Sequence, residues 1–400
     1  MANQLITTQL VSNTALAMFS NNAPFLMTAS RMYQQDFTSA GYKIGSTLQV
    51  RRQNNFLVGD GPSATPQDIV ETVEDITIAH QYHAMIAYTI QDLELKIDDF
   101  SRIFIQPAIQ AIISQIELGL CSSAVYELNY FTGQAGTPIN SFAAVDAAGT
   151  ALLEQGVDIS RDAYLALSLR DASTVKAGAM SYFTPMFNEE IIRQSAIGHM
   201  SYFDMFQSQN IIRHTAGNGP QLHPGDTLTL SANVSSGNVI SISGATASVT
   251  DYFLPGDQIS IEGVYTVNSI SKNPNQTNMQ FVIQQAVDSG SGSFDIVVSP
   301  EIITSGPQQN VSGTLLSGAE VTVQNSYNCN IAYTERSLDI VCPPLYKLQV
   351  PYIATATDPS TGLSLTVTQS GDINNYTNYM RIDVLCGFKW HPQYAVKVLS

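Results

Sequence analysis

One long amphipathic helix, predicted between Ile97 and Leu128, constrains the fold more than any other stretch of this 400-residue sequence. Apolar residues recur along it at helical spacing, and polar residues occupy the opposite side. Such a helix needs a surface to cover its apolar face, and the rest of the chain reads as shorter, mostly extended segments. The apolar positions are Ile105, Ile109, Ile112, Ile113, Ile116, Leu120, Ala124 and Leu128, with Gln106, Gln110, Ser114 and Glu117 between them.

Pro107 interrupts this helix about two turns after Asp98 and Asp99, either of which can cap its start. The proline ring removes one backbone hydrogen bond, so the helix is expected to bend or restart there. A long amphipathic helix occurs in many folds and does not by itself indicate a function. The side chains expected to carry its packing are Pro107, Ile109, Ile112, Ile116 and Leu120.

Composition places the chain among globular proteins of two or three structural units and argues against nucleic-acid binding. Its 400 residues are 44% hydrophobic, which is enough to bury a sizeable core. There are 17 Lys and Arg residues against 33 Asp and Glu residues, a formal charge of −16. A surface of this sign repels phosphate groups, so direct binding of DNA or RNA is disfavoured.

The cysteines and the N-terminal stretch indicate synthesis in a reducing compartment. Cys121, Cys329, Cys342 and Cys386 are widely spaced, without a C-x-x-C pair or a nearby histidine pattern, so neither a zinc site nor a disulfide framework is expected. Residues 1–30 carry no charge and no basic start, unlike a signal peptide. Since no run of about 18 consecutive apolar residues occurs, no membrane span is expected.

Before the helix, the sequence predicts an arm followed by a long hairpin. Leu5 to Ser20 has the pattern of a short amphipathic helix, within an arm of residues 1–45. Residues 46–89 read as two extended runs around the turn sequence Gly59-Asp60-Gly61-Pro62. Because an isolated hairpin is marginal in water, this loop is expected to lie on a sheet or on another chain.

After the helix, an all-β unit interrupts a mixed host. Ser160 to Asp171 and Asn188 to Ile197 are predicted helices, each with a capping polar residue. Between Gly217 and Ser326 there are eight acidic residues, one lysine and no arginine, and short alternating runs separated by Gly, Pro, Asn and Ser. This pattern predicts a small inserted barrel whose two ends lie close together. From Tyr327 the host resumes with three or four strands.

Five stretches follow the order and spacing of one known family. On them the chain resembles the major capsid proteins of tailed phages with the Hong Kong 97-type fold, and more narrowly the podovirus coat proteins with an inserted β-barrel domain. The stretches are DLELKIDDFSRIFIQPAIQAI, GHMSYFDMFQSQNIIRHTAGN, LPGDQISIEGVYTVNSISK with QFVIQQA, NIAYTERSLDIVCPPL, and GLSLTVTQSGDINNYTNYMRIDVLCGFKWHPQYAVKVL.

The resemblance implies an α+β fold and an architecture for the whole chain. It implies a structural protein that self-assembles into hexamers and pentamers of an icosahedral shell around double-stranded DNA, with a scaffolding protein, a portal ring and a possible decoration protein as partners. The shell would form in the host bacterial cytoplasm. The implied parts are an N-terminal arm (1–45), an extended loop (46–89), the spine helix of a peripheral domain (90–129), an axial domain (130–216), the inserted barrel (217–326) and C-terminal strands shared by the axial and peripheral domains (327–400).

Three residues of the extended loop are candidates for contacts between subunits: Arg51, Arg52 and Asp60. Arg51 and Arg52 are neighbours on a predicted strand and face opposite ways, so one of them could reach an acidic residue of another copy. Solvated surface arginines are an equally good explanation. Some relatives lock the shell through a lysine in this loop, but residues 46–89 contain none, so self-crosslinking by that route is not expected.

Catalytic and metal-binding patterns are weak, so neither an enzyme nor a cofactor is expected. The triplet Asp288-Ser289-Gly290 matches the short signature of aspartic proteases, but it occurs once, in a flexible turn. His80 and His83 lie three apart on a strand and face opposite sides, which argues against a shared metal. The remaining acids are ascribed to turns or helix starts. They are Asp226, Asp257, the pair Asp98-Asp99 and the pair Glu189-Glu190.

Two alternatives from other classes stay open on the sequence alone. A secreted, acidic, β-rich adhesin or carbohydrate-binding module would account for the strands rich in Asn, Ser and Thr. A hydrolase that uses Asp288 would lose its activity in the Asp288→Asn variant.

Overall fold

We analysed a computed structural model of the chain, which divides into two compact units. The first unit contains Met1–Val50, Val73–Leu120 and Leu338–Lys389, and the second contains Arg51–Thr72, Cys121–Ser337 and Trp390–Ser400. The structure describes residues 12–13, 15–17, 24–30, 45–51, 55–58, 60–61, 66, 73–88, 101–160, 162–179, 198–345, 352–357, 364–372 and 377–400.

The first unit is built on an antiparallel sheet that joins distant parts of the sequence. β19 is its central strand, pairing with β18 on one side and with β3 over nine positions. The short helix α2 (Pro24–Thr28) is followed by a bridge between Ser30 and Asp339. The strands are β3 (His80–Tyr88), β16 (Leu338–Val341), β17 (Tyr352–Thr357), β18 (Ser364–Asp372) and β19 (Thr377–Trp390).

The predicted long helix is present and restarts at the proline. A short π-helix, η3 (Ser101–Ile105), leads into α4 (Gln106–Glu127). Pro107 is the second residue of α4, so the helix changes from the π to the α hydrogen-bond pattern next to the residue that lacks an N–H. It is exposed, so its expected part in the packing face is wrong. The buried face is made by the other four predicted side chains, Ile109, Ile112, Ile116 and Leu120.

The segment Ile103–Glu127 is long and apolar enough to cross a membrane by length and composition alone. Half of its apolar window, 50%, is buried inside the protein, as in the core helix of a globular domain. At Gly119 the helix lies against β3 and β19, because an added Cβ would come within 2.8 Å of the Tyr82 hydroxyl and 3.3 Å of the Phe388 ring.

The hairpin predicted for residues 46–89 is present in part, because only the first section of its return strand pairs within the hairpin. β1 (Thr47–Arg51) pairs with β2 (Val73–Thr77), as a two-stranded excursion requires. β3, expected to continue the return strand, instead pairs with β19 from Tyr88↔Asn378 to His80↔Cys386. Nine residues in register on the long strand β19 give β3 more backbone bonds than the hairpin offers. Gly59 and Pro62 of the expected tip lie outside the described residues.

The second unit contains a seven-stranded mixed sheet in the order β4-β20-β15-β5-β7-β6, with β8 pairing β15. The helices α5 (Phe142–Glu154) and α6 (Leu169–Ala179) pack on it, and Leu165, Val175 and Val398 belong to their common core. The strands are β4 (Phe131–Gly133), β5 (Ala163–Leu167), β6 (His199–Met200), β7 (Phe203–Gln207), β8 (Arg213–His214), β15 (Tyr327–Thr334) and β20 (Ala395–Leu399).

The helix predicted for Ser160 to Asp171 is wrong. Residues 163–167 form the buried strand β5, paired with β15 on one side and with β7 on the other, and helix α6 begins only at Leu169. Ala and Leu favour helices, but two neighbouring strands offer this segment more backbone and core contacts than its propensity is worth. The helix predicted for Asn188 to Ile197 lies outside the described residues.

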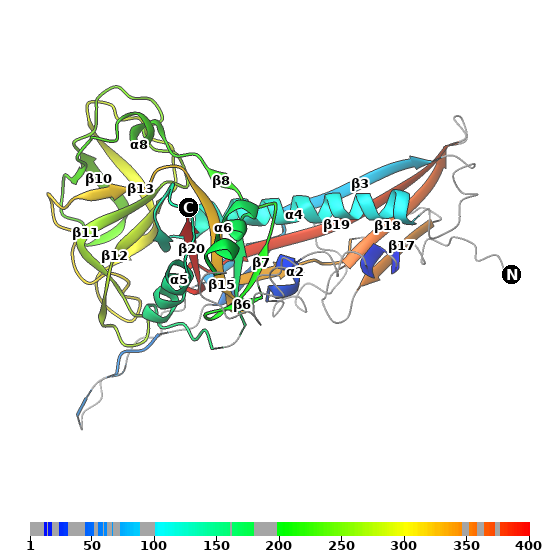
Figure 1. The fold of residues 1–400 in the computed structure, drawn as a ribbon, viewed down its shortest axis with the longest axis horizontal. Coiled ribbons are helices and arrows are strands. Elements are labelled where there is room, and N and C mark those ends of the chain that lie inside the picture. Colours follow the sequence, from blue (N-terminus) through cyan, green and yellow to red (C-terminus); the bar gives the residue numbers. More distant parts are fainter. Residues whose placement is uncertain are drawn as a thin grey trace. The chain divides into compact units, whose positions relative to one another are not determined.

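The inserted unit is a closed six-stranded barrel (Figure 1). Its sheet order is β14-β11-β12-β13-β10-β9, and backbone bonds from Leu230 N to Ala319 O (3.0 Å) and from Val321 N to Leu228 O (2.9 Å) join the last strand to the first. The strands are β9 (Thr229–Leu230), β10 (Ser236–Ser243), β11 (Gln258–Val267), β12 (Pro274–Ile283), β13 (Ser293–Ile303) and β14 (Val321–Val323).

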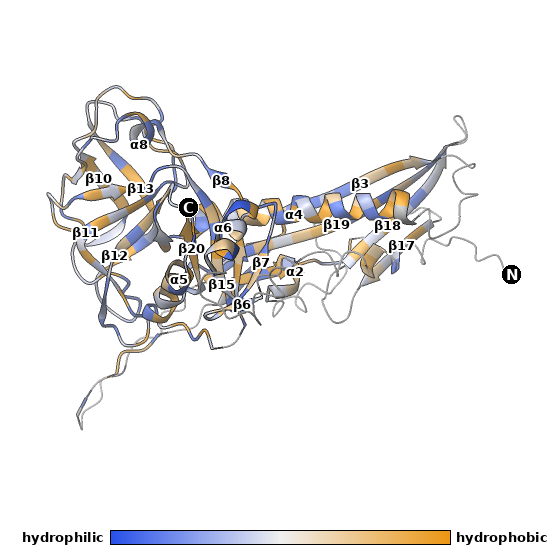
Figure 2. Ribbon diagram, viewed as in Figure 1, coloured by the Kyte–Doolittle hydropathy of each residue, from blue (hydrophilic) through white to orange (hydrophobic). Residues whose placement is uncertain are grey.

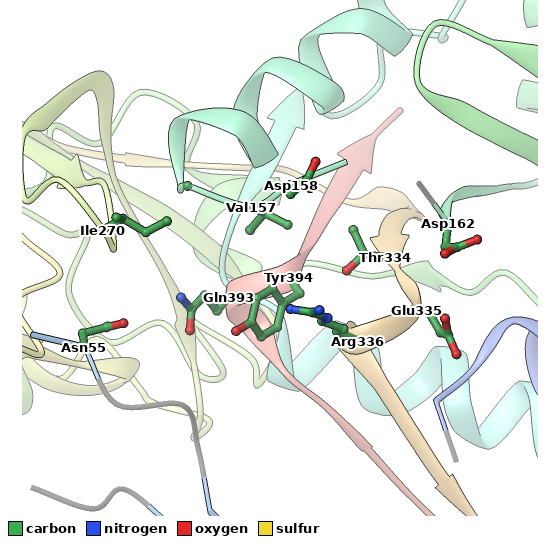
Figure 3. A pocket seen from close by; sticks show the side chains of 11 residues that line it. Asn55, Val157, Asp158, Asp162, Ile270, Thr334, Glu335, Arg336, Gln393 and Tyr394 are labelled. Atoms are coloured by element: carbon green, nitrogen blue, oxygen red, sulfur yellow. The ribbon is translucent and has the colours of Figure 1, made fainter. Parts of the chain in front are cut away.

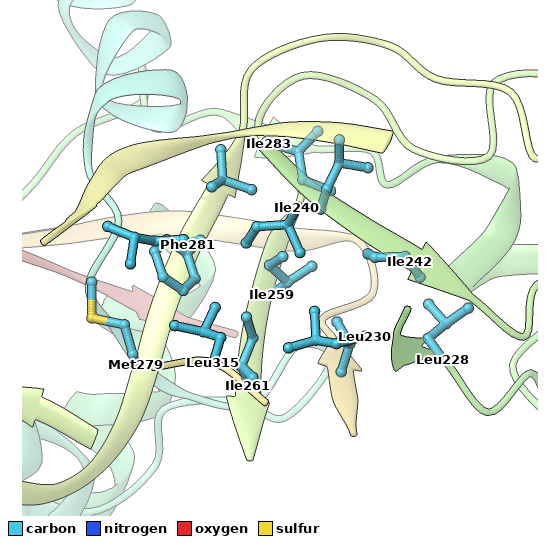
Figure 4. Packing of buried hydrophobic residues seen from close by; sticks show 14 of the residues in the cluster. Leu228, Leu230, Ile240, Ile242, Ile259, Ile261, Met279, Phe281, Ile283 and Leu315 are labelled. Atoms are coloured by element: carbon cyan, nitrogen blue, oxygen red, sulfur yellow. The ribbon is translucent and has the colours of Figure 1, made fainter. Parts of the chain in front are cut away.

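The barrel has a hydrophobic core of its own. Hydrophobic and hydrophilic residues alternate along its strands in Figure 2, as strands with one buried face require. The inward side chains of four strands and two loops meet in Figure 4. Labelled there are Leu228, Leu230, Ile240, Ile242, Ile259, Ile261, Met279, Phe281, Ile283 and Leu315.

Candidate functional site

The chain enters and leaves the barrel through two segments that lie side by side. Arg213 and His214 of β8 pair with Asn328 and Tyr327 of β15, and the backbone N–H of Ala216 donates to Ser326 Oγ at 3.1 Å. We call these two segments, residues 213–217 and 326–328, the neck. Adjacent ends are what the insertion of a domain requires.

Asp257 is the buried anchor of the neck. It is 0% exposed and lies in the turn Leu254–Asp257 at the base of the barrel. One carboxylate oxygen accepts from His214 Nε2 at 2.7 Å, and the other accepts from the backbone N–H groups of Gly217 at 3.1 Å and Leu254 at 2.8 Å. The prediction of a simple turn residue is thus incomplete, because Asp257 also holds the incoming chain.

Gly256 allows this turn to approach the neck. Its φ is +97°, and an added Cβ would come within 2.7 Å of Val125 Cγ1 and 3.0 Å of His214 Cε1. Only glycine combines a positive φ with so close an approach. The end of α4, the neck and the barrel turn are therefore in contact around one residue.

Lys397 connects strand β20 to the neck and to the end of α4. Its side chain is fully buried, and its ammonium donates to the carbonyl oxygen of Val125 at 2.6 Å and to the Tyr327 hydroxyl at 3.5 Å. With the Gln258 amide oriented by its neighbours, Gln258 Oε1 also accepts from Lys397 Nζ. Burial lowers the pKa of Lys397 to about 8, and the nearby Cys329 thiol opposes that shift.

The C-terminal end of α4 favours the positive charge of the Lys397 ammonium. Val125 lies in the last turn of α4, whose carbonyl groups carry partial negative charge and lack helical partners. Tyr327 adds its ring face, 5.8 Å from the ammonium, and its own hydroxyl donates to Gly256 O at 2.9 Å. Burial raises the pKa of Tyr327 well above its usual value, so this hydroxyl keeps its proton.

Three barrel glutamines bind the backbone around the end of α4. Gln280 makes a reciprocal pair with Phe131, accepting from its N–H at 2.7 Å and donating to its carbonyl at 2.9 Å. Gln284 donates to the carbonyl of Tyr126 at 3.0 Å, and Gln258 donates to the carbonyl of Asn129 at 3.0 Å. These amides supply partners to backbone groups in the last turn of α4, in the connection to β4 and at the first residue of β4.

The hairpin between β11 and β12 makes a second attachment to the host. Asn268 Nδ2 donates to the carbonyl of Glu154 at 2.9 Å, and Ser269 N donates to the carbonyl of Gln155 at 3.2 Å. Thr277 donates to the Glu154 carboxylate at 3.0 Å. The C-terminal end of α5 is thereby bound to the barrel, in addition to the neck.

The catalytic and metal candidates have structural roles. Asp288 accepts from the backbone N–H of Asp251 at 2.7 Å in an exposed turn, and Asp226 accepts from Thr246 and Tyr252. His80 stacks on Tyr82 and Phe388. Across the described residues, no group of three or more His, Cys, Asp and Glu side chains is arranged to hold a metal ion.

The loop residues predicted for contacts between subunits are only partly visible. Asp60 is exposed, and Arg51 ends strand β1. The Arg51 side chain, all of Arg52 and the pair Glu189-Glu190 lie outside the described residues.

Sequence reasoning missed the residues that hold the barrel. Gln280, Gln284 and Lys397 lie in strands or at their ends, and no local pattern distinguishes them from other polar residues. A Lys inside AVKVL, whose neighbours are all apolar, is the one signal that could have pointed to a buried charge.

Comparison with known proteins gives one family and several similar solved structures. The family model "P22 coat protein - gene protein 5" matches residues 63–395. Similar solved structures are the capsid of Ralstonia phage GP4 (TM-score 0.47, 7% identity, 93% of this chain and 87% of that chain) and a chain from Mycobacterium phage Che8 (0.46, 10%, 94% and 90%). The CUS-3 coat protein I-domain is similar to 25% of this chain over 96% of its own length, at 20% identity and a TM-score of 0.20. No curated protein matches the sequence.

Proposed function

The chain belongs to the P22 coat protein family, and from this we propose how its parts serve the assembly of a shell. The match over residues 63–395 confirms the resemblance drawn from the five sequence stretches. The protein is a structural component of the virion, the major capsid protein whose copies self-assemble into the icosahedral shell of a phage. This family match is the observation that carries the function, and it replaces the adhesin alternative.

The inserted barrel (217–326) stabilises the subunit by holding three host elements together. Its support is the set of bonds that Asp257, Gln258 and Gln280 make to the neck, to Lys397 and to the segment after α4. A subunit that forms many weak contacts with its neighbours needs a host fold that does not unfold locally where the barrel is attached.

The remaining parts keep the roles implied by the family. The arm (1–45) and the extended loop (46–89) lie on neighbouring copies, with Arg51, Arg52 and Asp60 as contact residues. Residues 90–129 form the spine of the peripheral domain, 130–216 the axial domain, and 327–400 strands of both. The exposed side chain of Asp60 and the two-stranded excursion of β1 and β2 support this assignment.

The shell assembles in the bacterial cytoplasm with a scaffolding protein and a portal ring, with or without a decoration protein, and it catalyses no reaction. It encloses double-stranded DNA without binding it specifically. A formal charge of −16 supports the last point, because an acidic surface does not adhere to packaged phosphates.

Electron microscopy of the chain expressed in bacteria, with and without its scaffolding partner, tests this function. Uniform closed shells are the expected result. Monodisperse small particles under both conditions would contradict it, and a glycan-binding screen would then follow. Asp288→Asn serves as a control, since a structural protein should form the same shells with this variant.

A further inference from the structure

One end of the central sheet in the second unit carries an acidic pocket of about 400 Å³. It lies where β15 ends, β5 begins and the turn Pro392–Tyr394 leads into β20. Asp158, Asp162 and Glu335 lie on its rim with one guanidinium, Arg336, so the charged side chains sum to −2. All four are exposed, as a docking surface requires.

The floor of this pocket holds an unused hydrogen-bond group. Thr334 is 5% exposed, and its hydroxyl has no partner in the described part of the chain. Figure 3 shows this hydroxyl pointing toward Tyr394 and Arg336, into the space that the pocket residues enclose. A buried polar atom without a partner is costly, so the site is built to receive a group that can donate to it.

The opposite end of the same sheet is basic. Arg170 at the start of α6 and Arg213 of β8 both line a pocket of about 330 Å³ beside Asn328. Both arginines are exposed, and neither side chain makes a hydrogen bond or ion pair with any residue that the structure describes. The one side-chain carboxylate in this pocket, that of Asp171, is buried and already accepts from Ser168, Asn330 and Ser400.

The strand register fixes these two pockets at opposite ends. β15 runs antiparallel to both β5 and β20, and it passes from Asn328 at the basic pocket to Thr334 at the acidic one. Six residues of strand span about 20 Å. The sheet is therefore charged with opposite signs at its two ends.

We propose that copies of this chain associate head to tail through these ends, with Arg170 and Arg213 of one copy against the acidic pocket of the next. The proposal rests on the proposed function, because it specifies one contact of the self-assembling subunit. Complementary but different surfaces on one molecule generate a closed ring when the rotation between copies closes. A guanidinium supplies both the positive charge for the carboxylates and an N–H for the Thr334 hydroxyl.

Charge reversal at each end, followed by mixing, tests the contact. Variant A carries R170E and R213E, and variant B carries D158K and E335K. Asp162 is left unchanged because its φ of +53° disfavours lysine. Each variant alone should lower the yield of shells by about tenfold or more, since like charges would then face each other. An equimolar mixture should restore six-membered rings of alternating A and B, because every contact in them again joins opposite charges. Five-membered rings cannot alternate, so hexameric rings, and not closed shells, are the readout for the mixture.

The control variant E262K/E301K makes the same change in net charge as variant B, on exposed barrel residues, and should assemble normally. Wild-type yields from A or B alone would overturn the proposal, and so would failure of the mixture when both variants are folded. Trp390 fluorescence reports folding, and the single changes R170E and E335K replace the pairs if a double variant is unfolded. Failure of the wild-type chain to form shells would instead contradict the proposed function.

Discussion

Asp257 shows how one side chain can decide whether an inserted domain stays attached to its host. Its two oxygens accept three hydrogen bonds, from the neck and from its own turn, at a position with no solvent exposure. A buried carboxylate that satisfies several donors is stabilising only while all of them remain in place. Removing it leaves His214 and two backbone N–H groups buried without partners.

Asp257→Ala should therefore lower the free energy of unfolding by about 3 kcal/mol. The measurement is urea unfolding followed by the fluorescence of Trp390, the single tryptophan, which is buried in the same unit. Asp288→Ala is the matched control, since that carboxylate accepts one bond at an exposed turn and should cost less than about 1 kcal/mol. Equal losses in both variants would contradict the special role of Asp257.

The burial of Lys397 predicts how the free energy of unfolding changes with pH. The folded state releases this proton at a pKa of about 8, below the ordinary value of 10.5. Between these values the unfolded chain binds more protons, so the free energy of unfolding rises with pH. Cys329 acts in the opposite direction from about pH 9 upward, because burial raises its pKa from 9.0 to about 11 and the folded state keeps this proton longer than the unfolded chain.

Between pH 7.5 and pH 9, the Lys397 contribution should amount to about 1 kcal/mol of added stability. Lys397→Met should remove this part of the pH dependence, and Lys176→Met, a control on the surface of α6, should keep it. Urea unfolding at both pH values measures the difference. An unchanged slope in Lys397→Met would show that the ammonium is not the titrating group.

At the scale of elements, α6 depends on a close approach that only glycine permits. A Cβ on Gly178 would overlap the carbonyl oxygen of Asn140, while Thr174, one turn earlier, donates to the carbonyl of Ile139 at 2.8 Å. Gly178→Ala should destabilise the protein by about 2 kcal/mol, although alanine is the better helix former. Ser173→Ala, at an exposed position of the same helix, should be neutral. Thermal unfolding of both variants decides; a stabilised Gly178→Ala would refute the contact.

Two glutamines, Gln280 and Gln284, attach the barrel to the backbone around the end of α4 and serve as test and control. Gln280 is 7% exposed and makes two bonds to Phe131, whereas Gln284 is half-buried and makes one bond to Tyr126. Gln280→Leu should cost about 2 kcal/mol and Gln284→Leu less than about 1 kcal/mol. Hydrogen exchange at the Phe131 amide is the direct measurement. Unchanged protection in Gln280→Leu would mean that this pair does not hold the backbone there.

The elements that sequence predicts well are those whose stability is local. Alternation along five strands of the barrel predicted them, and helical spacing predicted α4. The strand β5 was predicted as a helix because AYLAL has helical propensity, and only its pairing with β15 and β7 overrides that preference. The adjacent ends of the barrel were predicted, but the side-chain bonds that hold it to the host were not, since those of Gln280 and Lys397 join residues 149 and 272 positions apart. No spacing rule covers such distances.

At the scale of the whole molecule, the barrel and its host depend on each other unequally. The barrel closes its own sheet and contains its own core between Leu228 and Val323. The host, by contrast, relies on barrel residues to satisfy Lys397, His214 and the backbone after α4. This asymmetry predicts which part can survive separation.

Residues 217–326 expressed alone should therefore fold cooperatively, with a single thermal transition in near-ultraviolet circular dichroism. The host with this segment replaced by a short linker should lose stability and form few or aberrant shells, because its buried ammonium and several backbone groups lose their partners. Normal shells from the deletion variant would refute the stabilising role of the barrel. A barrel that folds only within the full chain would instead show that its core is insufficient, and that the neck contributes to both parts.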